Sequence, residues 1–188
     1  MSLVTKNALG KSLKKFLRIK TLDKITIQEI VDECGLNRQS FYYHFSNVYD
    51  LVSYTFAKDV EDNLEDKVNY DDWKEGFLVV LNYCLDNSLI IYNLYHSRGR
   101  SILEEGLKDY VNKLLIRVIE AEINELNIKV TSKDKRFIAN YNMFAFVGVV
   151  MLWIDSNMAE NPKILIERIS ILIKGDFKKA LLTFSLEK

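Results

Sequence analysis

A short segment near the N-terminus carries side chains that suit recognition of a hydrogen-bonding surface. Residues 38–45 read RQSFYYHF, so an arginine and a glutamine precede a cluster of hydroxyls, aromatic rings and a histidine. Arginine can hold guanine O6 and N7 bidentately, glutamine suits adenine N7 and N6, and a tyrosine ring can pack against a thymine methyl. Serine, tyrosine and histidine can also donate to phosphate oxygens. This chemistry matches a reader of the DNA major groove.

Helical spacing divides this segment into two faces. Phe41 and Phe45 are four residues apart, so they share one side of a helix. We expect that side to turn inward, against Leu36, Ile30 and Val31. The outward arc then carries the candidate reading residues, Arg38, Gln39, Ser40, Tyr42, Tyr43 and His44.

The preceding residues predict a second short helix and a tight turn. The sequence TIQE at 26–29 has the form of a capping box, in which the Thr26 hydroxyl accepts the Glu29 amide and the Glu29 carboxylate reaches back. Gly35 supplies the left-handed conformation that ends this helix, and Asn37 can cap the next one. Two short helices joined by a glycine turn, the second one polar and basic, form the pattern of a helix-turn-helix.

Charge distribution favours a polyanion at the N-terminal end. Residues 1–56 hold eight basic and five acidic side chains, although the whole chain is neutral. Differences of this size also occur in proteins without a polyanionic partner, and helix-turn-helix look-alikes are common. A helical protein-interaction module with a degenerate helix-turn-helix and no specific DNA site therefore stays open as an alternative.

The rest of the chain predicts an all-α protein. Apolar residues recur at helical spacing almost from end to end, and one proline with seven glycines disfavours an all-β fold. We expect about nine helices, at 8–19, 26–34, 38–45, 47–66, 71–86, 88–95, 101–126, 132–158 and 162–184. The expected domains are a helix-turn-helix domain at 1–47, a connecting helix and acidic segment at 48–70, and a helical regulatory and dimerisation domain at 71–188.

The sequence offers no visible catalytic motif, so we do not expect an enzyme. It lacks G-x-x-x-x-G-K-[ST], G-x-G-x-x-G, H-E-x-x-H and G-x-S-x-G. The carboxylates of Glu104, Glu105 and residues 61–66 are expected on solvated helix faces. Cys34 and Cys84 lie far apart without metal-ligand spacing, which predicts two reduced thiols in the cytoplasm and neither metal nor cofactor. The apolar run 144–154 is too short to span a membrane.

Residues 25–52, ITIQEIVDECGLNRQSFYYHFSNVYDLV, resemble the DNA-binding segment of TetR/AcrR-type transcription regulators. The matching positions are Thr26, Ile30, Cys34, Gly35, Leu36, Asn37, Ser40, Phe41, Tyr42, His44, Phe45 and Leu51. By this resemblance, Thr26 would contact a phosphate at the start of its helix. Arg38, Gln39 and Tyr42 would face bases, and Ser40, Tyr43 and His44 would face the DNA backbone.

The resemblance fails at Val48, where many members of the family have a lysine that holds a phosphate. The salt dependence of DNA binding should then be shallower than usual, or another group must compensate. Lys24 and the amide end of the fourth helix are the two candidates for that role.

The resemblance also implies a homodimer on a palindromic operator, with the last two helices of each copy in a four-helix bundle. The expected interface residues are Phe144, Val147, Met151, Ile154, Ile169, Leu172, Ile173 and Phe177. The family core often holds a small ligand, and a protein effector is a second possibility. Candidate ligand-lining residues are Tyr92, Tyr95, His96, Arg98, Tyr141 and Trp153. The SRGR run at 97–100 either binds an anion or forms a plain loop.

Residues 136–173 are similar to a subgroup related to regulators of dihydroxyacetone-kinase operons. That subgroup ends in an aromatic-rich helix, a W-I-x-x-x-M/N segment and a final dimer helix. Trp153, Ile154, Met158 and Pro162 match it.

Overall fold

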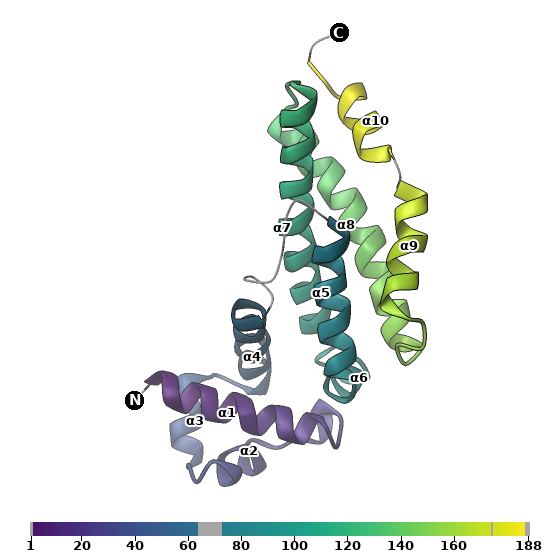
Figure 1. The fold of residues 1–188 in the computed structure, drawn as a ribbon. Coiled ribbons are helices and arrows are strands. Elements are labelled where there is room, and N and C mark those ends of the chain that lie inside the picture. The colour runs from purple at the N-terminus through teal and green to yellow at the C-terminus, as the bar shows by residue number, and fades with distance from the viewer. Residues whose placement is uncertain (1, 64–72, 174, 187–188) are drawn as a thin grey trace. The chain divides into compact units, whose positions relative to one another are not determined.

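The structure is a computed structural model of the 188-residue chain, and it describes residues 2–63, 73–173 and 175–186. These residues form α-helices, one 3-10 helix and no strand, so the predicted all-α class is confirmed (Figure 1). The helices are α1 (Ser2–Leu17), η1 (Leu22–Lys24), α2 (Ile27–Glu33), α3 (Arg38–His44), α4 (Val48–Asn63), α5 (Trp73–Asp86), α6 (Ser88–Tyr95), α7 (Arg100–Leu126), α8 (Ser132–Asp155), α9 (Pro162–Ile173) and α10 (Asp176–Thr183).

Packing divides the chain into two compact units. The N-terminal unit comprises Met1–Asp66 with Asp86–Gly106, and the C-terminal unit comprises Lys67–Leu85 with Leu107–Lys188. The domains expected from the sequence are contiguous, whereas α6 packs with the N-terminal helices despite its later place in the chain. Part of the expected acidic connector, residues 64–70, lies outside the described residues.

Helix α1 forms the centre of the N-terminal unit. Leu9, Leu13 and Leu17 lie on one stripe and are fully buried, because α1 contacts α2, α3, α4 and α6 (Figure 1). The helix begins at Ser2, earlier than the predicted residue 8. This stripe supplies the core on which the helix-turn-helix rests.

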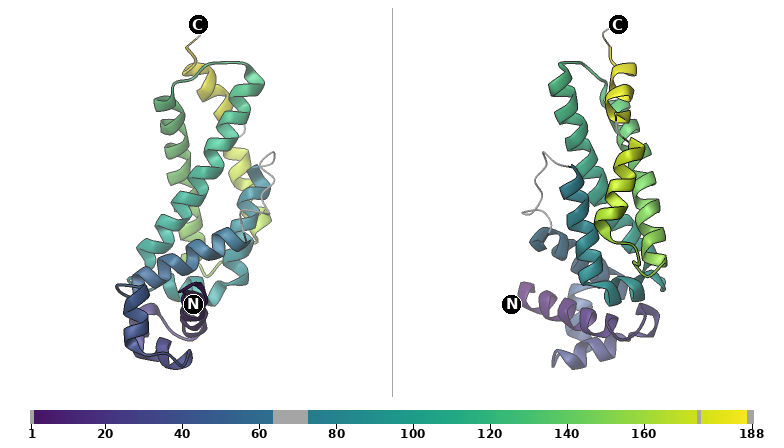
Figure 2. Two further views of the ribbon diagram at one scale, coloured as in Figure 1. Left: turned by 90° about the vertical axis from the view of Figure 1, so that its left-hand side faces the viewer. Right: turned by 45° about the vertical axis from the view of Figure 1, so that its right-hand side comes forward.

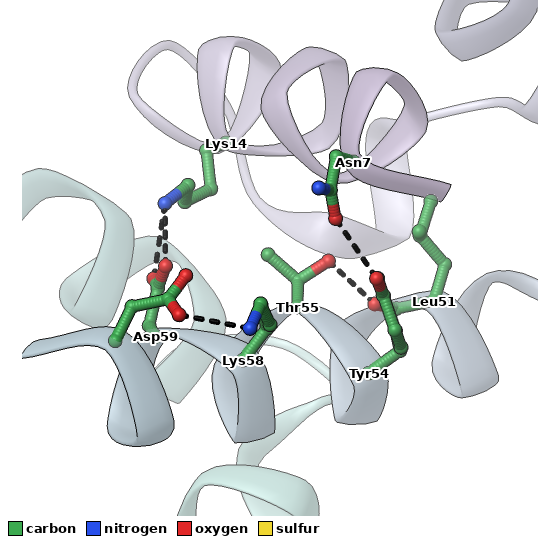
Figure 3. A network of polar contacts seen from close by, with 8 residues as sticks. Asn7, Lys14, Leu51, Tyr54, Thr55, Lys58 and Asp59 are labelled. Carbon is green, nitrogen blue, oxygen red and sulfur yellow. Dashed lines mark hydrogen bonds and ion pairs between the residues drawn. The ribbon is translucent and has the colours of Figure 1, made fainter. Parts of the chain in front are cut away.

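Helices α1 and α4 approach closely at Gly10. A Cβ atom there would lie 2.9 Å from the Thr55 hydroxyl, so glycine allows the two helices to meet. Two polar contacts flank this crossing in Figure 3: Lys14 Nζ lies 2.8 Å from an Asp59 carboxylate oxygen, and the Tyr54 hydroxyl donates to Asn7 Oδ1 at 2.8 Å. The crossing fixes α4 against the helix-turn-helix.

The loop between α6 and α7 also belongs to the N-terminal unit. The Asn93 side-chain amide donates to the Leu17 carbonyl at 2.8 Å, and the Arg98 amide donates to both Asp23 carboxylate oxygens at 3.2 and 3.3 Å. Gly99 is buried between two leucines, since a Cβ there would lie 2.8 Å from Leu22 Cδ2 and closer still to Leu94. The loop is therefore held against the start of α2 through η1.

The C-terminal unit is a bundle in which α5, α7, α8 and α9 run beside one another (Figures 1 and 2). Phe77 of α5 stacks on Phe146 of α8 with ring centroids 4.1 Å apart, and the Tyr110 hydroxyl of α7 donates to the Gly76 carbonyl at 3.1 Å. The helix expected over 162–184 is divided at Gly175. Its φ of +78° lies in the left-handed region, which ends α9 and lets α10 begin.

By length and composition, α8 is the one helix among the described residues that could cross a membrane without a break. Half of its most apolar stretch is buried within the chain. The helix ends at Asp155 instead of the expected 158, because Asn157 and Met158 both adopt left-handed backbone conformations.

The two cysteines lie in different units. Cys34, in the N-terminal unit, is half-buried and donates to the Ala8 carbonyl at 3.4 Å, and burial raises the pKa of its thiol. Cys84, in the C-terminal unit, is buried, which raises its pKa to about 12. Both thiols are therefore protonated at neutral pH.

Candidate nucleic-acid interface

The capping box predicted at the start of α2 is present. The Thr26 hydroxyl accepts the Glu29 amide at 3.2 Å, and the Glu29 carboxylate accepts the Thr26 amide at 2.9 Å. Lys20 Nζ lies 2.5 Å from the other Glu29 carboxylate oxygen. The Lys20 hydrogen bond, followed by those from Thr26, lowers the pKa of Glu29 to about 2. These contacts fix the direction in which α2 leaves the η1 turn.

The turn between α2 and α3 follows the predicted glycine geometry. Gly35 has a φ of +66°, and its amide donates to the Asp32 carbonyl at 3.1 Å. The Leu36 amide reaches back to the Val31 carbonyl at 2.9 Å, which closes the end of α2. Asn37 then caps α3 by accepting the Ser40 amide at 2.8 Å. Local hydrogen bonds therefore determine the angle at which α3 emerges.

The faces of α3 are arranged as its spacing predicts. Phe41 is fully buried and Phe45 nearly so, with ring centroids 5.8 Å apart. Tyr42 is 52% exposed and Tyr43 82% exposed. The other candidate reading residues also remain accessible: Arg38 and Gln39 are exposed, and Ser40 and His44 are half-buried. One polar, aromatic and basic surface thus faces solvent across the whole helix.

Two candidate phosphate donors already have partners. The Ser40 hydroxyl donates to Asn37 Oδ1 at 3.0 Å, and the Thr26 hydroxyl donates to a Glu29 carboxylate oxygen at 3.0 Å. Both hydroxyls serve helix caps here and would have to exchange these bonds to donate to a phosphate. The sequence does not reveal that the cap and a phosphate compete for each hydroxyl, because a short polar residue at a helix start suits both roles.

The amide end of α4 is also occupied, which bears on the missing lysine at Val48. Asn47 Oδ1 accepts the Tyr49 amide at 2.8 Å and the Asp50 amide at 3.1 Å. The Asp50 carboxylate turns back to accept the Ser46 amide at 3.0 Å. Because two amides are satisfied and a carboxylate stands beside them, this helix end is a poor substitute for the lysine. Lys24, at the end of η1, is exposed.

The candidate ligand residues do not form one group. Tyr92, Tyr95, His96 and Arg98 belong to the N-terminal unit, whereas Tyr141 and Trp153 belong to the C-terminal unit. Tyr141 is 71% exposed in the single chain, and its role as a ligand residue remains a prediction. Trp153 is buried, and its indole N–H donates to the Glu160 carbonyl at 2.8 Å. That bond closes the loop after α8, which gives the tryptophan a structural role.

The four N-terminal-unit candidates differ in their surroundings. Tyr95 is buried, and the Arg100 guanidinium lies over its ring at 4.2 Å. Tyr92 and His96 are exposed, with ring centroids 4.2 Å apart. Arg98 is exposed and contacts Asp23 through its backbone amide. The SRGR run therefore forms a structured loop, and its use as an anion site remains a prediction.

The candidate dimer residues fall on two sides of their helices. Val147, Met151, Ile154 and Ile169 are buried within the chain itself, so they pack the C-terminal unit and present no surface to a partner. Phe144 and Leu172 are exposed, and Phe177 is half-buried. The side chain of Ile173 lies outside the described part.

An exposed apolar stripe on α8 was not distinguished in the sequence. Its members are Phe137, Tyr141, Phe144 and Leu152, with Gly148 exposed between the last two. They recur at helical spacing and lie opposite the buried side of the helix. Because α8 is apolar around much of its circumference, its sequence alone shows two apolar sides without indicating which is free. On α9 the exposed apolar residues are Ile164, Ile171 and Leu172.

Two protein-family models match the chain. A model described as bacterial regulatory proteins of the tetR family matches residues 20–55, which include every candidate DNA contact. A model described as a transcriptional regulator C-terminal region, of the same TetR group, matches residues 71–175, more than half of the chain.

Known proteins with similar sequence or structure include several regulators. The HTH-type dhaKLM operon transcriptional activator DhaS of Lactococcus lactis is 26% identical over 148 residues, which cover 79% of this chain and 78% of that protein. A solved structure titled dihydroxyacetone kinase operon activator DhaS has a TM-score of 0.71 at 21% identity, over 94% of this chain and 98% of that one. NalD, a repressor of a multidrug efflux pump in Pseudomonas aeruginosa, has a TM-score of 0.58 at 14% identity, over 99% and 98% of the two chains.

Proposed function

The chain belongs to the TetR family of bacterial transcriptional regulators, and from this premise we propose that it binds a palindromic DNA operator as a homodimer. The observation that carries the proposal is the solvent-facing side of α3, where Arg38, Gln39 and Tyr42 are exposed above buried Phe41. A short helix with this composition can enter the major groove and meet base edges. Members of this family act as transcription regulators and not as enzymes.

We propose that the dimer forms through the exposed stripe on α8 and the exposed apolar residues of α9. Leu152 is 70% exposed and Leu172 is 77% exposed in the single chain. Apolar surface at helical spacing along two neighbouring helices is suited to burial against the same surface of a second copy. A two-fold dimer would present two α3 helices to two operator half-sites.

We further propose that an effector, a small molecule or a protein, controls DNA binding through the C-terminal unit. The similarity to a dhaKLM operon activator makes the promoter of a dihydroxyacetone kinase operon the first candidate operator to test. Because its target would be chromosomal DNA, we expect the protein to act in the cytoplasm. Repression and activation are both compatible with this arrangement.

The test is a double substitution on the reading face. An operator is first selected from random duplex DNA, and its affinity is measured for the native protein and for Arg38→Ala/Tyr42→Ala. We expect specific binding to fall by roughly 1–3 kcal/mol per lost base contact, while the oligomeric state is unchanged. Arg136→Ala removes an exposed arginine from α8 and serves as the matched control. If the double variant binds the operator as well as the native protein, α3 is not the reading helix.

A further inference from the structure

Lys6 occupies an unusual position in α1. It precedes Leu9, Leu13 and Leu17 by three, seven and eleven residues, which places it on the same stripe as these fully buried leucines. Lys6 is half-buried where this stripe reaches the N-terminal end of the unit. A lysine at a core-facing position is uncommon, because burial disfavours its charge unless an anion or another polar group lies nearby.

The Lys6 ammonium rests on aromatic rings. Its Nζ lies 5.4 Å from the centroid of Tyr54 and 5.9 Å from that of Phe45. Tyr54 is held in place by its hydrogen bond to Asn7 (Figure 3). Cation–π attraction favours an ammonium at such a site. Within the described part of the chain, no carboxylate is paired with Lys6, whereas Lys14 and Lys15 of the same helix pair with Asp59 and Glu33.

A row of rings connects this site to the reading helix. Tyr43 contacts His44 at 4.9 Å, His44 contacts Phe45 at 6.4 Å, and Phe45 contacts Tyr54 at 5.5 Å between ring centroids. Lys6 therefore lies beside the C-terminal end of α3, at the junction that leads into α4. Val48, the position at which a phosphate-binding lysine is missing, belongs to the same junction.

The other candidate replacements fit this place less well. The amide end of α4 is capped by Asn47 and flanked by the Asp50 carboxylate. Lys24 precedes α2, so it stands at the opposite end of the helix-turn-helix sequence from the α3–α4 junction. We infer that Lys6 supplies the phosphate contact beside the C-terminal end of α3, in place of the absent lysine at position 48. This inference rests on the DNA-binding function proposed above.

Salt dependence of DNA binding tests the inference without knowledge of the operator. Affinity for duplex DNA of arbitrary sequence is measured over a range of KCl concentrations for the native protein and Lys6→Met. Methionine keeps the aliphatic packing and removes the charge. Loss of one phosphate contact should reduce the steepness of log K against log salt by about 0.9 per subunit, and should weaken binding roughly five- to tenfold per subunit near physiological salt.

Two further variants test whether the change in slope is specific to the position of Lys6. Lys11→Met removes an exposed lysine from the same helix and should leave the slope unchanged. Val48→Lys in the Lys6→Met background should restore the native slope, because both positions would serve the same junction. Far-UV circular dichroism and the thermal midpoint confirm that each variant is folded.

Three outcomes would overturn the assignment. An unchanged slope for Lys6→Met would show that the ammonium only packs on its rings. An equal reduction of the slope for Lys11→Met would show a general charge effect. If Lys6→Met/Val48→Lys keeps the reduced slope, positions 6 and 48 serve different parts of the DNA backbone. If the native protein itself shows no salt-dependent binding, the proposed function fails instead.

Discussion

The Glu29 carboxylate makes two kinds of contact at the start of α2. It completes the capping box with Thr26 and pairs with Lys20, and its pKa falls to about 2 from an ordinary value of 4.5. A carboxyl whose pKa is lower in the folded than in the unfolded state stabilises the fold when it is ionised. That contribution is complete above pH 4.5 and is lost as the pH falls toward 2.

We therefore expect the stability difference between the native protein and Glu29→Gln to depend on pH. The native protein should be the more stable near neutral pH, and its advantage should shrink steadily below pH 4.5. Urea unfolding at a series of pH values measures this difference. Lys20→Met should raise the pKa of Glu29 in an NMR titration, whereas Lys11→Met should leave it unchanged. An advantage of the native protein that does not change below pH 4.5 would contradict the linkage.

Sequence spacing predicts which side of α3 is buried, because Phe41 and Phe45 are the apolar pair four residues apart. It also predicts the Thr26 capping box, which depends only on local geometry. It does not predict that Lys20 pairs with Glu29 or that the Ser40 hydroxyl is engaged by Asn37. Several partners compete for each such group, and the three-dimensional arrangement selects among them.

Among the connecting elements, the α6–α7 loop has the most restricted geometry. Gly99 is enclosed by Leu22 of η1 and Leu94 of α6, and both leucines are buried. The backbone of the same loop binds Asp23. A larger residue at Gly99 would push two packed side chains apart, so the loop and η1 would separate.

We expect Gly99→Ala to destabilise the N-terminal unit by about 1–3 kcal/mol, the usual effect of overpacking a core. Gly106→Ala is the matched control, because it lies inside α7 and a Cβ there meets nothing within 4 Å. That variant should be as stable as the native protein or more stable by about 0.5–1 kcal/mol. Thermal or urea unfolding followed by circular dichroism compares the two. A Gly99→Ala protein with native stability would show that the leucines rearrange freely.

The boundaries of most helices are predictable, since polar and glycine breaks separate the apolar periods. The exceptions are the earlier start of α1, the earlier end of α8 and the division of the last helix. Residues 162–184 keep an apolar period across Gly175, and a glycine inside such a pattern is compatible with a continuous helix. The left-handed φ of Gly175 marks the division between α9 and α10, and a glycine inside an apolar period does not by itself reveal that angle.

At the scale of the whole molecule, the exposed stripe of α8 is the surface through which we propose that two copies associate. Its apolar residues alternate with the buried residues that fill the C-terminal unit, so one helix serves both the core and the proposed interface. The sequence predicts an interface in this region but assigns it partly to Val147, Met151 and Ile154, which face inward. Which apolar side of α8 faces inward is determined by contacts such as that between Phe146 and Phe77.

We expect Leu152→Glu to convert the proposed dimer into folded monomers. A carboxylate without a partner in the buried interface would oppose association by roughly 3 kcal/mol or more. Light scattering after size-exclusion chromatography reports the mass, and circular dichroism reports the fold. Lys163→Glu introduces a carboxylate at an exposed polar position of α9 and should remain dimeric. Operator affinity should fall with the dimer in Leu152→Glu. An unchanged mass would exclude the α8 stripe as the interface.

The distribution of the two thiols has a consequence for studying the protein in solution. Cys34 lies in the N-terminal unit and Cys84 in the C-terminal unit, and burial keeps both protonated and slow to react. Alkylation of the buried Cys84 therefore requires the C-terminal unit to open, whereas the half-buried Cys34 is partly accessible in the folded N-terminal unit. Peptide mapping after timed exposure to a thiol reagent would report the opening of the C-terminal unit through Cys84 and the access to Cys34 in the N-terminal unit, both in the native, unsubstituted chain. The same measurement with DNA or an effector added would show which unit each of them protects from alkylation.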